Sequence, residues 1–159
     1  MILVLLGTQN NSFVRLLDAV QDCINKKIIN EEVIVQAGFT KYESKDMKIF
    51  SMINSENFSK MLDEADLIIT HAGVGSLISS LERGKKVIVV PRLKRYNEHV
   101  NNHQIQIARK YKHEGYVKSV MNLKNLGRAI KSMENFEPKE YKKTKSEILS
   151  IIENFIDNS

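Results

Sequence analysis

Two glycine-containing segments of this sequence have the composition of anion-binding turns. Residues 7–12 read GTQNNS and residues 71–76 read HAGVGS, and each follows a run of apolar residues. Glycine allows a tight turn and a close approach of the backbone to a ligand, and the free N–H groups at the start of a helix attract anions. In the second segment the N–H groups of Gly75, Ser76 and Leu77, together with the Ser76 hydroxyl, could bind a diphosphate. The GxG spacing alone is weak evidence, because other tight turns also use glycine.

A third segment is crowded with hydrogen-bonding side chains. Residues 97–108 read NEHVNNHQIQIA and contain two histidines, several amides and one carboxylate. A ligand rich in hydroxyl groups needs such a set, because each buried hydroxyl left unpaired costs about 1–3 kcal/mol. A sugar is therefore the ligand that best accounts for this composition. The alternative is that these side chains cap a helix and face water.

The surrounding pattern predicts an α/β domain, because short apolar runs alternate with amphipathic segments. We expect strands at 2–7, 32–38, 48–53, 66–70, 86–90 and 115–120. We expect helices at about 12–24, 56–64, 76–83, 100–112 and 122–134. Buried strands separated by helices indicate a doubly wound, Rossmann-like parallel sheet that is covered on both faces. Ligands bind such sheets at the carboxyl ends of the strands, so the three segments should meet at one edge.

The helix expected after the first segment has candidate caps and a cysteine. Thr8, Gln9 or Ser12 could cap its N-terminus. Cys23 lies on its apolar side, which predicts a core residue rather than a reactive thiol. No Cys/His spacing for zinc is present, so we expect no structural metal.

Pro138 is the most plausible break in the chain, since proline does not continue a helix. We therefore expect a nucleotide-binding domain at 1–137 and a C-terminal segment at 138–159. That segment has an apolar stripe at helical spacing, which predicts a helix over about 139–157. The helix would pack on its own domain or on a partner.

The positive charge of the chain is concentrated in its C-terminal third. The chain carries a net charge of +5, and residues 109–145 hold eleven Lys or Arg against four Glu. A solvated face, a membrane surface and nucleic acid are the alternatives. No nucleic-acid-binding module is recognisable, so the membrane is the better of the last two. No apolar run approaches the ~20 residues of a membrane span and no signal peptide is evident, so we expect a cytoplasmic protein.

Taken together, the HAGVGS and EHVNNHQ motifs carry a family resemblance. The chain resembles the nucleotide-sugar-binding half of the glycosyltransferase family that includes the peptidoglycan UDP-GlcNAc transferase. It is more similar to the catalytic small subunits of two-chain enzymes, which act in dolichol-linked N-glycan synthesis or add a β-1,4-linked sugar, often galactose, in bacterial capsule or exopolysaccharide assembly. The similarity covers roughly residues 1–120. RLKRYNEHVNNHQ, at residues 92–104, favours the bacterial branch.

The resemblance implies a GT-B donor-binding half and a set of donor-binding positions. These positions are Gly7, Thr8, Gln9, Met52, Ile53, Gly73, Gly75, Ser76, Ser79, Glu98, Asn102, His103 and Gln104. The family usually has an acidic residue, which binds the ribose, at the position of Ser79. This departure supports the alternative of a non-catalytic enhancer subunit.

The implied activity is an inverting transfer from a UDP-sugar, galactose or GlcNAc, to a lipid-diphosphate-linked acceptor at the inner face of the cell membrane. A separate membrane-anchored subunit would bind the acceptor, because the acceptor-binding half is absent from the sequence. We expect no cofactor and no metal, since no DxD-type acidic pair is present. His99 is the candidate general base, although the base could equally belong to the partner. His71 either has a catalytic role or holds the turn through a hydrogen bond.

Overall fold

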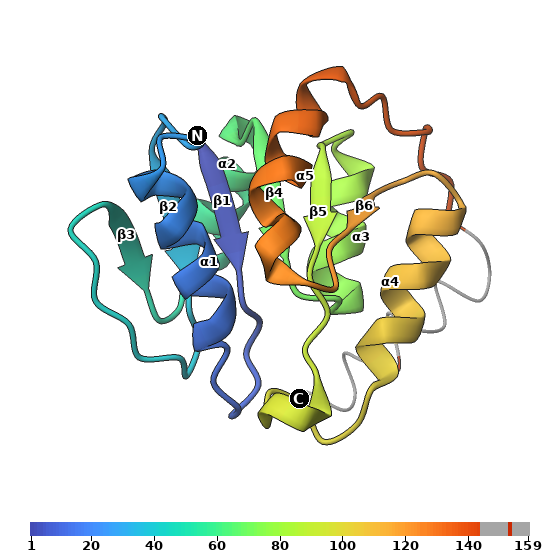
Figure 1. Ribbon diagram of the computed structural model, residues 1–159. Coiled ribbons are helices and arrows are strands. Elements are labelled where there is room, and N and C mark those ends of the chain that lie inside the picture. The colour runs from blue at the N-terminus through green and yellow to red at the C-terminus, as the bar shows by residue number, and fades with distance from the viewer. Residues whose placement is uncertain (144–152, 154–159) are drawn as a thin grey trace.

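The computed structural model describes residues 1–143 and residue 153. Its centre is a six-stranded parallel sheet with the strand order β3-β2-β1-β4-β5-β6 (Figure 1). The strands are β1 (Ile2–Leu5), β2 (Val33–Gln36), β3 (Met47–Phe50), β4 (Leu67–Thr70), β5 (Val87–Val89) and β6 (Lys118–Ser119). Five lie within the predicted runs, β3 begins one residue before its run at 48–53, and the expected doubly wound, Rossmann-like sheet is confirmed. The chain reverses its direction of strand addition between β1 and β4, which is where such folds bind ligands.

Helices cover both faces of the sheet (Figure 1). They are α1 (Val14–Asn25), α2 (Ser55–Glu64), α3 (Val74–Glu82), α4 (His103–His113) and α5 (Leu126–Ser132), with short 3-10 turns at Lys94–Tyr96, Leu123–Asn125 and Met133–Asn135. One apolar cluster joins the sheet to α1 and α5, and a second joins it to α2, α3 and α4. The sheet is therefore the middle of three layers.

The central strands β1 and β5 are apolar at every position, and β4 is apolar except for the buried Thr70, because these strands face both layers. In β1, Ile2 and Val4 belong to the cluster under α1 and α5, whereas Leu3 and Leu5 belong to the opposite cluster. Side chains alternate between the faces of a strand, so only an uninterrupted apolar run can fill both. Cys23 is buried in the first of these clusters, as expected from its place on the helix.

The first helix begins later than expected and has a different cap. Helix α1 starts at Val14, its N-cap is Phe13, and no side chain of the chain before it makes a capping hydrogen bond. The Phe13 N–H instead donates to Thr40 Oγ1 at 2.9 Å, from the loop after β2. The prediction that Thr8, Gln9 or Ser12 caps this helix is therefore wrong. A tertiary contact supplies the acceptor that the local sequence was expected to provide.

The C-terminal segment packs on the body without being helical over residues 139–143. The Lys139 N–H donates to the Gly115 carbonyl at 3.1 Å, and the Tyr141 ring lies edge-on to Tyr116 with centroids 5.3 Å apart. The helix expected from residue 139 thus does not begin there. The rest of it lies outside the described residues, apart from Glu153, which is helical. The division at 137/138 stays a prediction, and these contacts cross it.

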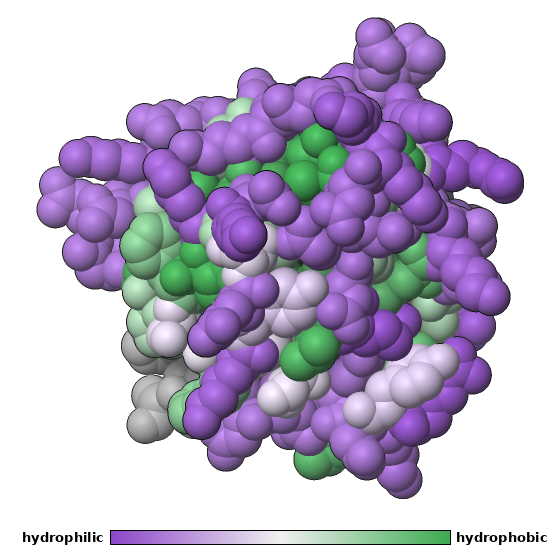
Figure 2. All heavy atoms as spheres, turned by 60° about the vertical axis from the view of Figure 1, so that its left-hand side comes forward, coloured by the Kyte–Doolittle hydropathy of each residue, from purple (hydrophilic) through white to green (hydrophobic). Residues whose placement is uncertain are grey.

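The surface is mostly hydrophilic on the face drawn in Figure 2, where apolar patches are small and separated by polar side chains. Among the described residues, no helix is both long enough and apolar enough to cross a membrane.

Candidate functional site

A cavity of about 780 Å³ opens at the carboxyl edge of the sheet, next to the ends of β1 and β4. Its walls combine the three segments that the sequence singled out. The predicted site residues that line it are Gly7, Thr8, Gln9, Ile53, His71, Gly73, Gly75, Ser76, His99, His103 and Gln104. Four predicted residues, Met52, Ser79, Glu98 and Asn102, do not line it.

The N-terminus of α3 supplies free N–H groups to this cavity. Gly73 is the N-cap, and the Leu77 N–H donates to its carbonyl at 3.1 Å. The free N–H groups therefore belong to Val74, Gly75 and Ser76, one residue earlier than the expected set of Gly75, Ser76 and Leu77. All three residues line the cavity. The helix dipole adds partial positive charge at this point, which suits an anionic ligand.

The His71 ring lies between two glycines at the floor of the cavity. A Cβ atom at Gly7 would stand 2.5 Å from His71 Nε2, and one at Gly73 would stand 2.2 Å from His71 Cε1. Any larger residue would displace the imidazole. Gly7 also has a φ of +82°, and a Cβ at Gly38 would stand 2.3 Å from its carbonyl oxygen. The two glycines of the predicted turns are thus required for close packing around His71, as well as for turning the chain.

His71 is neutral at physiological pH. The side chain is only 5% exposed, and its Nδ1 lies 3.0 Å from Gln104 Nε2. The pKa of His71 is lowered from 6.5 to about 3, mainly by burial and then by the positive charge of Arg92. A neutral imidazole of this kind can donate or accept a hydrogen bond without bringing a charge.

The other two histidines of the cavity lie at the start of α4 and in the loop before it. His99 Nδ1 accepts a hydrogen bond from the Asn101 N–H at 3.2 Å. Partial burial, then the charges of Arg92 and His103, lower the pKa of His99. His103 is exposed, and its N–H donates to Asn101 Oδ1 at 2.8 Å. Both imidazoles can therefore reach a ligand from the same wall.

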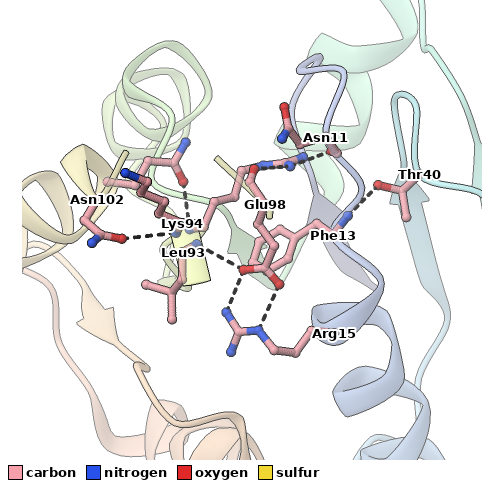
Figure 3. A network of polar contacts seen from close by, with 10 residues as sticks. Asn11, Phe13, Arg15, Thr40, Leu93, Lys94, Glu98 and Asn102 are labelled. Carbon is pink, nitrogen blue, oxygen red and sulfur yellow. Dashed lines mark hydrogen bonds and ion pairs between the residues drawn. The ribbon is translucent and has the colours of Figure 1, made fainter. Parts of the chain in front are cut away.

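The carboxylate of Glu98 is bound by groups of the chain itself. Its side chain is buried, and its carboxylate accepts two hydrogen bonds from Arg15, both of 2.9 Å, and one from the Leu93 N–H at 3.0 Å (Figure 3). These contacts occupy the carboxylate, and Glu98 is not among the residues that line the cavity. Glu98 therefore holds the loop that carries His99, and its contact with the donor stays a prediction.

The three other predicted site residues that do not line the cavity are Asn102, Met52 and Ser79. Asn102 Oδ1 accepts a hydrogen bond from the Lys94 N–H at 3.1 Å, so it closes the loop on itself. Met52 has a side chain that is 61% exposed, while its neighbour Ile53 lines the cavity. Ser79 lies on α3, where its carbonyl accepts a hydrogen bond from Arg83.

Arg92 is a functional-site neighbour that sequence reasoning missed. Its guanidinium is fully buried and donates to the carbonyl oxygens of Leu6, of Asn11 at 2.7 Å and of Glu98 at 3.0 Å. It also lies over the Phe13 ring, 5.0 Å from the centroid. Burial lowers its pKa to about 10, opposed by Glu98, so it stays charged. The signal in the sequence was an arginine shortly after a buried strand, but two other basic residues, Lys94 and Arg95, follow it in the same loop.

This network joins two loops that are far apart in the sequence. Arg92 binds the loop after β1, and Asn11 Nδ2 donates in return to the Asn97 carbonyl at 2.9 Å. Figure 3 shows Asn11, Phe13 and Arg15 on one side and Leu93, Lys94 and Asn102 on the other, with Glu98 between them. Two walls of the cavity are therefore held in a fixed relation to each other.

The comparison with known families agrees with this architecture. The profile of the glycosyltransferase family 28 C-terminal domain matches residues 1–158. The chain belongs to this family. The family 28 chain is also similar to two curated proteins named UDP-N-acetylglucosamine transferase subunit ALG13. It is 31% identical to that of Candida glabrata over 93 residues, which is 58% of this chain and 43% of the relative. It is 34% identical to that of Candida albicans over 74 residues, which is 46% of this chain and 24% of the relative.

Solved structures share the fold of this family 28 chain. The NMR solution structure of ALG13 aligns with a TM-score of 0.59 and 22% identity, covering 95% of this chain and 93% of that one. The crystal structure of Acinetobacter baumannii MurG aligns with a TM-score of 0.59 and 20% identity, covering 84% of this chain and 41% of that one. At such identities the likeness concerns the fold alone. The matched segments cover less than half of the two curated relatives named above.

Proposed function

We propose that this family 28 chain is the donor-binding subunit of a UDP-sugar glycosyltransferase. The observation that carries the proposal is the meeting of His71, Gly7 and the free N–H groups of α3 at the floor of one cavity. These groups are uncharged or partly positive, and the arrangement suits a diphosphate without a metal ion. Among the described residues, no cluster of His, Cys, Asp or Glu could hold one.

In this proposal the N–H groups of Val74, Gly75 and Ser76 stabilise the charge that builds on the departing UDP. Preorganised donors of this kind do not need to reorient during the reaction, so their effect is larger than that of water. His99 and His103 line the wall beyond the diphosphate and would face the donor sugar. The transfer is inverting, and the base that takes the acceptor proton is His99 or a group of the partner.

The donor we propose is UDP-N-acetylglucosamine. The curated relatives described above are named as UDP-N-acetylglucosamine transferase subunits. The alternatives expected from the sequence, galactose as the donor sugar and a role in bacterial capsule synthesis, gain no support from these relatives. UDP-galactose therefore becomes the comparison ligand in the test rather than the favoured donor.

A calorimetric titration of the chain with UDP, UDP-N-acetylglucosamine and UDP-galactose tests the proposal. We expect saturable binding that weakens by about 10-fold or more in Gly75→Val and His103→Ala, since each change removes or blocks a group at the ligand. Unfolding curves of the variants would show whether the fold is retained. Binding that is unchanged in both variants would contradict this site.

The proposed partner is a membrane-anchored subunit that binds a lipid-linked saccharide at the inner face of the membrane. Lys139, Lys142 and Lys143 are exposed and precede the C-terminal residues. Replacing these three lysines with Gln should weaken co-purification with the partner or binding to anionic vesicles. The same change at Lys26, Lys48 and Lys60, which are also exposed, is the charge-matched control. Equal association of both variants would contradict the assignment.

A non-catalytic enhancer subunit is the second candidate. Ser79 stands where the family usually has an acidic residue, and its side chain does not line the cavity. If neither the chain nor its complex with the partner binds UDP, the enhancer role is favoured.

A further inference from the structure

Gln104 is buried in the first turn of α4 and is held by the backbone of two other loops. Its Oε1 accepts hydrogen bonds from the Ala72 N–H at 3.2 Å and from the Arg92 N–H at 2.9 Å. A backbone N–H can only donate, so the amide atom between these two groups must be the oxygen. The hydrogen-bond partners of the Gln104 amide therefore determine which of its two terminal atoms is the oxygen.

The orientation of Gln104 decides the protonation of His71. The other amide atom, Nε2, is an NH₂ group that can only donate, and it lies 3.0 Å from His71 Nδ1. His71 Nδ1 must therefore be the acceptor, without a hydrogen of its own. A neutral imidazole carries one proton, so this proton is on Nε2.

We propose that Gln104 is a positioning residue that fixes His71 as the Nε2–H tautomer, a permanent hydrogen-bond donor directed between Gly7 and Gly73 into the cavity. Nε2 and Cε1 are the two ring atoms nearest to both glycines, and all three residues line the cavity. The identity of the ligand rests on the function proposed above. The tautomer itself rests on the hydrogen bonds of Gln104.

The Nε2–H tautomer limits the chemistry that His71 can perform. With Nδ1 occupied by Gln104 and Nε2 protonated, the ring has no lone pair with which to take a proton from a substrate. The matching ligand atom is an oxygen that only accepts, such as an oxygen of a diphosphate. His71 would thus bind and stabilise a phosphate oxygen, and the general base must be another group. Gln104 acts mainly through His71, because its amide oxygen already has two partners.

Nitrogen NMR of the imidazole side chains tests the tautomer directly in the full chain without any ligand. Long-range proton–nitrogen correlations separate a protonated ring nitrogen from an unprotonated one. In the unmodified protein we expect His71 to show a protonated Nε2 and an unprotonated Nδ1 between about pH 5.5 and 8. A protonated Nδ1, or a mixture of tautomers, would overturn the proposal before any variant is made.

The Gln104→Glu variant tests the positioning role, because it replaces the NH₂ group of Gln104 with an oxygen that can only accept. A carboxylate can keep the two backbone N–H partners but can only accept from His71, so Nδ1 should become protonated, either in the neutral ring or in an imidazolium. Gln106→Glu is the control, because Gln106 lines the same cavity two residues along α4 and is exposed. It introduces the same charge without a hydrogen bond to His71, and the His71 nitrogen pattern should stay as it is. An unprotonated Nδ1 in a folded Gln104→Glu variant would refute the positioning role.

Should that variant fail to fold, Gln104→Met removes the NH₂ donor without adding charge. A mixture of His71 tautomers is then expected, and a retained pure Nε2–H form would show that Gln104 does not set it. Adding UDP to the unmodified protein tests the donor role. If UDP binds by calorimetry and the His71 Nε2 resonance does not move, the donor role is wrong. If neither the chain nor its complex with the partner binds UDP, the proposed function fails, and the tautomer assignment is still decided by the spectra of the chain without ligand.

Discussion

His71 makes the stability of the folded chain depend on pH. In the unfolded chain its pKa should be near 6.5, while in the folded chain it is lowered to about 3. Below pH 6.5 the unfolded chain takes up a proton that the folded chain does not, so the free energy of unfolding falls as the pH falls from 6.5 towards 3. The slope from this one group is at most about 1.4 kcal/mol per pH unit.

We therefore expect His71→Gln to flatten the pH dependence of unfolding between pH 6.5 and 4. Urea unfolding at a series of pH values measures this slope. His113→Gln serves as the control, since His113 is exposed at the end of α4. The physical argument fails if both variants keep the slope of the unmodified protein.

Gly73 and Gly84 require glycine for different reasons: space at Gly73 and backbone conformation at Gly84. Gly73 has a φ of −82°, which an alanine accepts, but its Cβ would stand 2.2 Å from His71 Cε1. Gly84 has a φ of +68° and nothing within 4 Å of the added atom. Gly73→Ala should weaken UDP binding by about 10-fold or more through displacement of the ring. Gly84→Ala should lower stability by about 1–2 kcal/mol through its left-handed backbone.

Calorimetry and urea unfolding of these two variants distinguish the effects. Gly84→Ala should bind UDP with the affinity of the unmodified chain, because Gly84 lies at the far end of α3. If Gly73→Ala instead binds UDP normally, the close approach of residue 73 to His71 is unimportant for the ligand.

At the scale of elements, the buried pair of Arg15 and Glu98 holds the start of α1 against the loop before α4. The Glu98 side chain is 3% exposed, and Arg15 is 22% exposed. Arg83 and Asp63 form a similar pair on the opposite face of the sheet, but Asp63 is 64% exposed. Removing a cation from a buried carboxylate leaves that charge unpaired, whereas an exposed carboxylate is hydrated by water.

Arg15→Met should consequently lower the free energy of unfolding by about 2–4 kcal/mol, and Arg83→Met by about 1 kcal/mol or less. Urea unfolding of both variants at neutral pH provides the comparison. Comparable losses from the two changes would show that Glu98 does not depend on Arg15 for its burial.

At the scale of the whole molecule, residues 138–143 belong structurally to the body. Lys139 bonds to Gly115, the Tyr141 ring packs on Tyr116, and Lys143 forms an ion pair with Glu82 at 2.5 Å. The apolar cluster under α2, α3 and α4 also includes Tyr141 at its margin. These contacts cross the boundary at 137/138 that the sequence suggested.

A chain ending at residue 143 should be more stable than one ending at residue 137. The shorter chain loses the aromatic contact, for which we expect about 0.5–1.5 kcal/mol beyond the buried area. Thermal or urea unfolding of the two truncated chains measures the difference. Equal stability would support the expected boundary at 137/138.

The sequence determined the sheet and the place of the site. The apolar runs of β1, β4 and β5 form the central strands because these are buried on both faces, whereas the edge strands β3 and β6 carry the polar side chains of Lys48 and Lys118. The segments around Gly7, Gly73 and His103 meet because the carboxyl ends of parallel strands share one edge. These features depend on local composition and on a topology that has few alternatives, so they could be predicted without coordinates.

Only the tertiary structure decided how the polar side chains pair. Glu98 looked like a ligand-binding residue, yet its partner is Arg15, which lies 83 residues away in the sequence. Arg92 looked like one more surface cation, yet it binds the carbonyl of Leu6, 86 residues away. Gln104 was expected to touch a sugar, yet its amide oxygen is taken by two loops. The partner of a polar group depends on which distant loops meet in space, and the composition of its own segment does not contain that information.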